Sequence, residues 1–140
     1  MKRIALVAVL VGALIVLHDP PWAGLVASGF RSWEEDPPGT RFRWSAGRAT
    51  FFIPSDATAM MLPLRTEFPG PNGGPTEVEI RSDDRPLATV RLTAAHVWVK
   101  TTLPVGGRTW RRYRRVDLRV NRVVPPFMLG VMVGEPTLTR

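Results

Sequence analysis

The sequence predicts an all-β protein, an antiparallel β-sandwich of about eight strands preceded by an N-terminal apolar helix. Three observations predict this fold class. From Thr40 onward, apolar and polar residues alternate, and no window keeps a helical repeat for three turns. The fourteen prolines and twelve glycines lie between apolar runs, which is typical of short strands joined by turns. An uncharged apolar run, residues 4–17, follows Lys2 and Arg3.

Residues 1–18 are predicted to be an export signal peptide or a membrane anchor. The apolar run spans about 21 Å as a helix, short of the roughly 30 Å hydrocarbon core, and that length is typical of an export signal. Val26 and Ser28 have the small side chains of a cleavage site but lie far beyond the run. A retained anchor with Trp22 at the membrane interface is therefore an equal alternative. In both cases the remainder is expected to be exported, either periplasmic or on the outer face of the cytoplasmic membrane.

Residues 19–39 are predicted to be a Pro/Gly-rich linker, and residues 40–140 the β-sandwich domain. The linker carries an acidic cluster and is expected to hold a short edge strand around residues 28–33. Its acidic residues are Glu34, Glu35 and Asp36.

Within the domain, one-sided alternation predicts sheets that each bury one face, and two such faces bury each other in a sandwich. Turns are expected at residues 45–48, 68–75 and 83–86, where glycine, proline, asparagine and aspartate gather. The residues expected to face the core are Phe42, Trp44, Ala49, Phe51, Ile53, Met60, Leu62, Leu64, Val78, Ile80, Ala88, Val90, Leu92, Val116, Leu118, Val120, Leu129, Val131 and Val133.

The stretch RTWRRYRRVDLRV, residues 108–120, carries six arginines, a tryptophan and a tyrosine. Its second half alternates, which predicts a strand whose outer face carries Tyr113, Arg115, Asp117 and Arg119. Those charges are expected on a solvated strand face, so the arginine content by itself leaves open whether the stretch is also a binding surface.

The sequence indicates a protein that is not an enzyme and that has no metal site or cofactor. It has no cysteine, hence no disulfide and no thiolate, and it lacks the GxSxG, HExxH and phosphate-binding glycine motifs. His18 and His96 belong to no catalytic motif. Asp83 and Asp84 could form a carboxylate pair or bind calcium, but hairpin aspartates more commonly bond nearby backbone amides, which is what we expect here.

Binding is the more open question. Trp98, Trp110, Arg111, Tyr113 and Arg115 are the candidate ligand-binding residues, because sugar rings stack on exposed indoles while arginine hydrogen-bonds hydroxyl groups. Trp98 alternates with Val97 and Val99, and this alternation predicts an outward-facing indole. The net charge of +7 attracts anionic partners of several kinds. Placement outside the cytoplasmic membrane argues against nucleic acid.

The segments FRWSAGRATFFIP, PTEVEIRSDDRPLATVRLTAAHVWVKTTLP and RRVDLRV resemble the jelly-roll accessory modules of the galactose-binding-like type. They are most similar to the periplasmic β-sandwich tails of bacterial membrane glycosyltransferases and related envelope proteins, over about residues 29–136. The resemblance implies a jelly-roll-like sandwich, no catalysis, and contact with a glycan or docking on a membrane glycosyltransferase. The chain departs from the tailed transferases in having at most one membrane segment, and no family ligand residue is carried over.

Two functions follow from the sequence. The first is a non-catalytic envelope binding or accessory module with carbohydrate as its ligand, attached to the membrane through the N-terminal segment. The alternative is a structural or partner-docking membrane-associated protein without a small ligand, whose arginine face meets anionic lipid or a protein.

Overall fold

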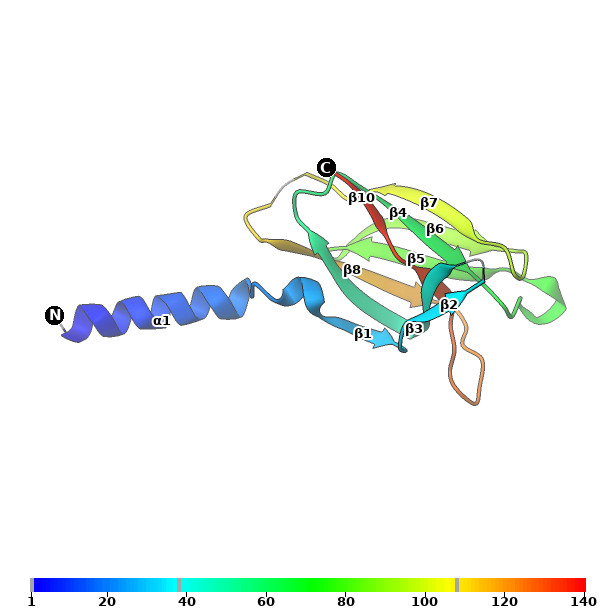
Figure 1. Ribbon diagram of the computed structural model, residues 1–140, viewed down its shortest axis with the longest axis horizontal. Coiled ribbons are helices and arrows are strands. Elements are labelled where there is room, and N and C mark those ends of the chain that lie inside the picture. The colour runs from blue at the N-terminus through cyan, green and yellow to red at the C-terminus, as the bar shows by residue number, and fades with distance from the viewer. Residues whose placement is uncertain (1, 38, 108) are drawn as a thin grey trace.

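The computed structural model describes residues 2–37, 39–107 and 109–140. A helix at the N-terminus leads into a β domain (Figure 1). The elements are α1 (Lys2–His18), η1 (Ala23–Leu25), β1 (Ala27–Phe30), β2 (Glu34–Asp36), β3 (Thr40–Pro54), β4 (Ala59–Arg65), η2 (Pro71–Gly73), β5 (Thr76–Ser82), β6 (Arg85–Leu92), β7 (Val99–Pro104), β8 (Tyr113–Val120), β9 (Met132–Gly134) and β10 (Thr137–Thr139). The predicted apolar helix and all-β domain are both confirmed.

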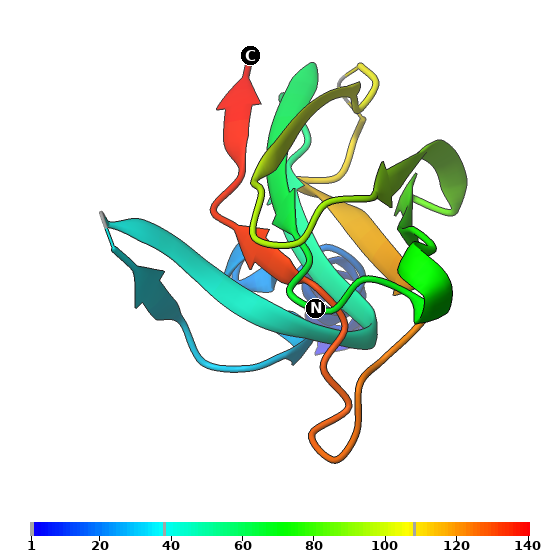
Figure 2. The same ribbon diagram turned by 90° about the vertical axis from the view of Figure 1, so that its right-hand side faces the viewer.

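The strands form two antiparallel layers that share β3. Its second half pairs with β1 and β8, and β5 and β6 complete that layer in the order β6-β5-β8-β3-β1. Its first half pairs with β2 and β9, and β4 continues the second layer, with β7 on one side and β9 and β10 on the other. The long β3 curves across the molecule to reach both layers (Figure 2). The antiparallel sandwich is confirmed, with ten strands among the described residues instead of about eight.

The core lies between the two layers. Val78, Ile80, Leu118 and Val131 are fully buried, and Val90 from β6 joins the same cluster. These side chains come from strands far apart in the sequence, as one-sided alternation requires. Most of the expected core positions are confirmed, and the buried ones are Phe42, Ala49, Phe51, Ile53, Met60, Leu62, Leu64, Val78, Ile80, Val90, Leu92, Val116, Leu118, Val131 and Val133. Four expected core residues are only half-buried: Trp44, Ala88, Val120 and Leu129. Ala88 and Val120 pack against the core cluster, whereas Trp44 lies against Phe42 and Phe68 just before the change of phase in β3.

The turn expected at residues 45–48 is wrong, because these residues lie inside β3. Ser45 donates its backbone amide to Val131 O (2.8 Å), and its Oγ accepts a hydrogen bond from Val131 N (3.0 Å). The buried positions change phase here, from Phe42 to Ser45 and then to Ala49. In sequence such a change resembles a turn. In the structure it is the place where β3 passes from one layer to the other.

The segment predicted as a linker contains β1 and β2, and both pair with β3. Gly29 makes this possible, since it has φ +72° and a Cβ there would lie 2.0 Å from Arg48 O. The edge strand expected around residues 28–33 is β1, which among the described residues pairs only with β3 and covers the first part of that range, and β2 begins just beyond its end.

Helix α1 extends from the domain, and all of its side chains are exposed. Within the span Lys2–Leu25, an 18-residue window has a mean hydropathy of 2.0, and the span is long and apolar enough to cross a membrane. A signal sequence would have the same properties. Beyond the end of this helix, η1 and β1 lead directly into the first layer (Figure 1).

Candidate functional site

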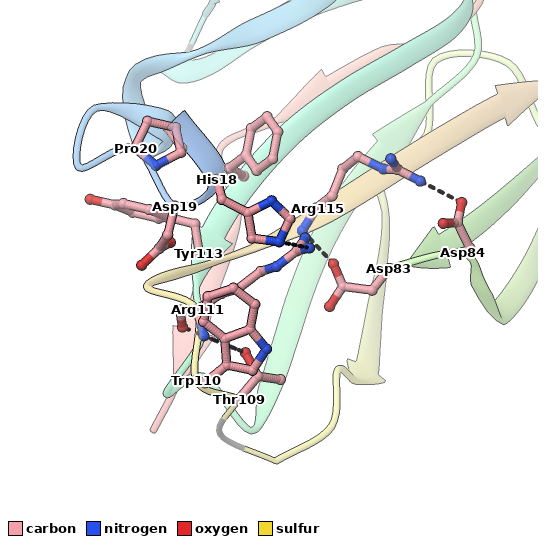
Figure 3. A pocket seen from close by; sticks show the side chains of 12 residues that line it. His18, Asp19, Pro20, Asp83, Asp84, Thr109, Trp110, Arg111, Tyr113 and Arg115 are labelled. Atoms are coloured by element: carbon pink, nitrogen blue, oxygen red, sulfur yellow. Dashed lines mark hydrogen bonds and ion pairs between the residues drawn. The ribbon is translucent and has the colours of Figure 1, made fainter. Parts of the chain in front are cut away.

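Four of the five predicted ligand-binding residues line one cleft of about 600 Å³ at the junction of α1 with the β domain. They are Trp110 and Arg111 in the β7–β8 loop and Tyr113 and Arg115 on β8 (Figure 3). The other lining residues are His18, Asp19, Pro20, Ala23, Phe52, Asp83, Asp84 and Thr109.

Trp98 does not line this cleft, and its expected outward orientation is wrong. The indole is half-buried, with its ring centroid 6.1 Å from that of Phe42 and 5.8 Å from the guanidinium carbon of Arg65. Val97, expected to point inward, is instead 50% exposed. The alternation fails because β7 begins only at Val99, so the preceding residues belong to a loop.

One wall of the cleft is formed where the end of α1 meets the β7–β8 loop. The His18 ring stacks on the Trp110 indole, with centroids 5.4 Å apart and planes 11° apart. An Arg111 Nη2 lies 3.3 Å from His18 Nε2. Asp19 Oδ1 accepts a hydrogen bond from Arg112 N (3.0 Å), which fixes the loop to the first residue after the helix. His18 and Asp19 were not among the predicted ligand-binding residues, because they lie 93 positions before their partners in this loop and only folding brings them together.

Tyr113 closes the base of this wall. A Cβ on Gly24 would lie 2.4 Å from Tyr113 Cε1, so only glycine lets the η1 backbone approach the phenol ring this closely. Ala23, the neighbouring residue, is buried against the domain. The short segment between the helix and β1 is therefore packed against the domain rather than extended away from it.

The opposite wall is the β5–β6 turn. Asp83 and Asp84 have φ of +45° and +68°, the positive values that a two-residue hairpin turn requires. Asp83 Oδ1 accepts a hydrogen bond from Arg115 N (3.0 Å), and Asp83 N donates to Arg115 O (3.0 Å). The expected turn is thus confirmed, but the backbone amide that Asp83 bonds belongs to β8 rather than to the turn, and Asp84 bonds a guanidinium instead. Within the described part of the chain, no cluster of three histidine or acidic side chains is placed to hold a metal ion.

Arg114 lies behind this turn and was missed in the sequence. It is 2% exposed, on the inward face of β8 with Val116 and Leu118. Its Nη1 donates to Asp83 Oδ2 (3.1 Å), and its Nη2 donates to Gly107 O. The alternation of β8 was the available signal, since it assigns position 114 to the buried face.

Arg115 forms the floor of the cleft on the outer face of β8. Its Nε donates to Asp117 Oδ2 (2.8 Å) and its Nη2 to Asp84 Oδ1. The hydrogen bond that Arg115 donates to Asp117 is the main cause that raises the pKa of Arg115, and burial opposes it. Thr50 Oγ1 donates to Asp117 Oδ1 (2.7 Å) and holds that carboxylate in place. The Asp84 side chain is 80% exposed, so the floor presents a fixed carboxylate–guanidinium pair to solvent.

Trp110 stands at the edge of the cleft with 71% of its surface exposed. Arg111 lies 5.3 Å from the indole centroid. Among the described residues, no carboxylate forms an ion pair with Arg111, whereas Arg115 and Arg112 both have one. The cleft therefore combines an exposed aromatic surface, an acidic group and an uncompensated cation.

A second aromatic group lies away from the cleft, around β1 and β3. The guanidinium carbon of Arg43 lies 3.7 Å from the Phe30 centroid and 4.6 Å from that of Trp33, and Arg41 lies 4.7 Å from the Trp33 ring. Burial lowers the pKa of Arg43. This stack covers the edge of the layer with cation–π contacts.

Comparison with known proteins leaves the family of this chain open. No family model matches it, and no curated protein matches it. A solved structure described as the EclA C-terminal domain, a sugar-binding protein, aligns with a TM-score of 0.45 and 12% identity over 77% of this chain and 90% of that one. A glycoside hydrolase family 43 arabinoxylan arabinofuranohydrolase from Bacillus subtilis, in complex with cellotetraose, aligns with a TM-score of 0.44 and 10% identity over 82% of this chain and 24% of that one. Because both scores are low, any role of the cleft depends on its own residues.

Proposed function

We propose that the protein is a non-catalytic saccharide-binding module of the cell envelope, held on the outer side of the membrane by its N-terminal segment. The saccharide occupies the cleft between the helix end and the β5–β6 turn. The observation that carries this proposal is the 71% exposed Trp110 indole beside the Arg115–Asp84 pair.

The chemistry of a sugar ring suits this arrangement. Its C–H face packs on an indole, and its hydroxyl groups both donate and accept hydrogen bonds. Asp84 offers acceptor oxygens and Arg115 and Arg111 offer donors at fixed positions. A site with a few fixed polar groups beside an apolar surface is the usual form of a small-ligand pocket.

Binding without catalysis is favoured by the partners of the reactive groups in the cleft. Both carboxylates of the β5–β6 turn are engaged by arginines, Asp83 by Arg114 and Asp84 by Arg115. The Thr109 hydroxyl bonds only the backbone of Arg111 among the described residues, so it has no general base.

Docking on a partner protein is a second candidate, supported by one observation. Residues 121–129 form a loop that projects from the domain (Figure 2), and Phe127 and Met128, 64% and 54% exposed, lie in its tip beyond the Val124–Leu129 bridge. Paired exposed apolar side chains of this kind are common at contact surfaces. Substituting Phe127→Ser would release a co-purified envelope protein if docking is the main function, and would leave saccharide binding unchanged if it is not.

The saccharide proposal is tested with the full chain in detergent micelles on a glycan array, followed by titration calorimetry of the best ligand. Trp110→Ala should weaken binding about tenfold, because loss of one aromatic binding contact costs about 1.4 kcal/mol or more. Trp98→Ala is the matched control, since this indole lies outside the cleft. Equal affinity of wild type and Trp110→Ala would contradict the proposal.

A further inference from the structure

We infer that the cleft faces the membrane surface and binds the acidic saccharide headgroup of a membrane lipid rather than a free polysaccharide. This inference rests on the proposed function and names its ligand class. It follows from the length of the apolar segment, from the way the domain is attached to it, and from the charge of the cleft.

Helix α1 is too short to cross the hydrocarbon core by itself. Its 17 residues span about 25 Å, against a core of roughly 30 Å. Apolar side chains beyond the helix make up the difference, because Trp22 is 52%, Leu25 90% and Val26 47% exposed. The candidate span accordingly runs to Leu25. When the segment crosses the bilayer, these residues lie at the interface, and so η1 lies there as well.

The domain has no slack that would let it move away from this interface. Asp19, the residue after the helix, is 13% exposed and bonds Arg112 N. Ala23 is buried and Gly24 contacts the Tyr113 ring, and β1 pairs with β3 from Ala27 onward. A flexible tether would place the domain at variable heights, whereas these contacts hold it next to the bilayer.

The cleft lies at the same depth as the helix end, because His18, Asp19, Pro20 and Ala23 form its wall. Figure 1 shows the β7–β8 loop at the end of the domain nearest α1, with the β6–β7 loop at the far end. A ligand in the cleft is therefore within the headgroup layer. A free polymer would have to enter between the domain and the lipid, whereas a lipid headgroup is already there.

The charge of the cleft selects an acidic headgroup. Arg111 contacts His18 Nε2 and the Trp110 ring, and no described carboxylate pairs with it. Arg115, in contrast, is neutralised by Asp84 and Asp117. A phosphate or carboxylate on the sugar would pair with Arg111 while the ring packs on Trp110. The acyl chains of the lipid that carries this headgroup would remain in the bilayer beside α1.

The first test measures depth and requires no ligand. The chain lacks cysteine, so Thr109→Cys and Thr93→Cys each accept one fluorophore. Thr109 lines the cleft, and Thr93 follows β6 at its far end, roughly 25 Å from the β5–β6 turn. In phosphatidylcholine nanodiscs with nitroxide-headgroup lipid, the label at residue 109 should be quenched at least several-fold more than the label at residue 93. Equal quenching of the two labels overturns the inference that the cleft faces the membrane. It does not affect the proposed saccharide binding, which the glycan array tests separately.

The second test identifies the source of the ligand. Amide hydrogen exchange of residues 109–113 is measured on the full chain in phosphatidylcholine nanodiscs. The exchange rates are compared when the nanodiscs contain phosphatidylglucoside, when they contain phosphatidylglycerol, and when soluble glucose 1-phosphate is added instead. Protection by phosphatidylglucoside only, lost in Arg111→Gln and kept in the distant control Arg91→Gln, is the expected result.

Each other outcome overturns a defined part. Equal protection by soluble glucose 1-phosphate overturns the lipid-borne source and keeps the proposed function. Equal protection by phosphatidylglycerol shows that the cleft does not recognise the sugar, and it overturns both the headgroup inference and the proposed saccharide binding. Absence of protection by every probe overturns the assignment of an acidic sugar headgroup.

Discussion

Arg114 gives the sharpest test of how this domain is stabilised, because a guanidinium that is 2% exposed reaches into the turn that borders the cleft. Arg114→Met keeps most of the apolar stem and removes the two hydrogen bonds to Asp83 and Gly107. The expected effect is a lower free energy of unfolding. Asp83 keeps its bond from Arg115 N, so the turn itself should persist.

The magnitude follows from the partners. A hydrogen bond that involves a charged group contributes about 1.5–3 kcal/mol. The Asp83 side chain is 35% exposed, so solvent screens that bond, and the lower end of the range applies to it. With about 1.5 kcal/mol for the bond to Asp83 and at least about 1.5 kcal/mol for the bond to Gly107, the predicted loss is at least about 3 kcal/mol, or roughly 12 °C in Tm at about 4 °C per kcal/mol for a domain of this size.

The assay is urea unfolding of the full chain in detergent micelles, followed by tryptophan fluorescence. Arg119→Met is the matched control, since Arg119 lies on the exposed face of the same strand and should change stability by less than about 0.5 kcal/mol. Asp83→Asn combined with Arg114→Met should cost less than the sum of the single changes. If Arg114→Met behaves like Arg119→Met, the assigned role of the buried guanidinium is wrong.

Two further substitutions test the path of β3. Gly29→Ala should destabilise the domain by at least about 2 kcal/mol, because alanine would take a positive φ and its Cβ would meet the Arg48 carbonyl; an unchanged urea midpoint would contradict this. Ser45→Ala should cost about 1–3 kcal/mol, since the buried Val131 amide loses its acceptor. The Val131 amide should also exchange its hydrogen faster in Ser45→Ala. Unaltered exchange there would show that the bond from Val131 N to Ser45 Oγ is not the cause of the lost stability.

Much of the fold was predictable because the domain buries one face of most strands. Val78 and Ile80 on β5 and Val116 and Leu118 on β8 all lie in the core as their alternation indicates. The passage of β3 between layers was not predictable, because the change of phase at Ser45 has the same local pattern as a turn. Strands β1 and β2 gain their structure from pairing with β3 rather than from their own proline- and glycine-rich composition.

The candidate site was predictable only where it is local in sequence. Trp110, Arg111, Tyr113 and Arg115 lie within six residues, and so their shared cleft agrees with their clustering. Asp84 and His18 enter the cleft through tertiary contacts that no local pattern encodes. The likeness to galactose-binding-like modules gave no residue of this cleft.

The shared strand also bears on how the domain resists partial unfolding. The chain has no cysteine, so no covalent cross-link can hold the two layers together. Continuous backbone does so instead, since neither layer can peel away without pulling β3 from its pairing in the other. Opening should therefore be cooperative across the whole domain, and proteases would meet few partly opened forms to cut.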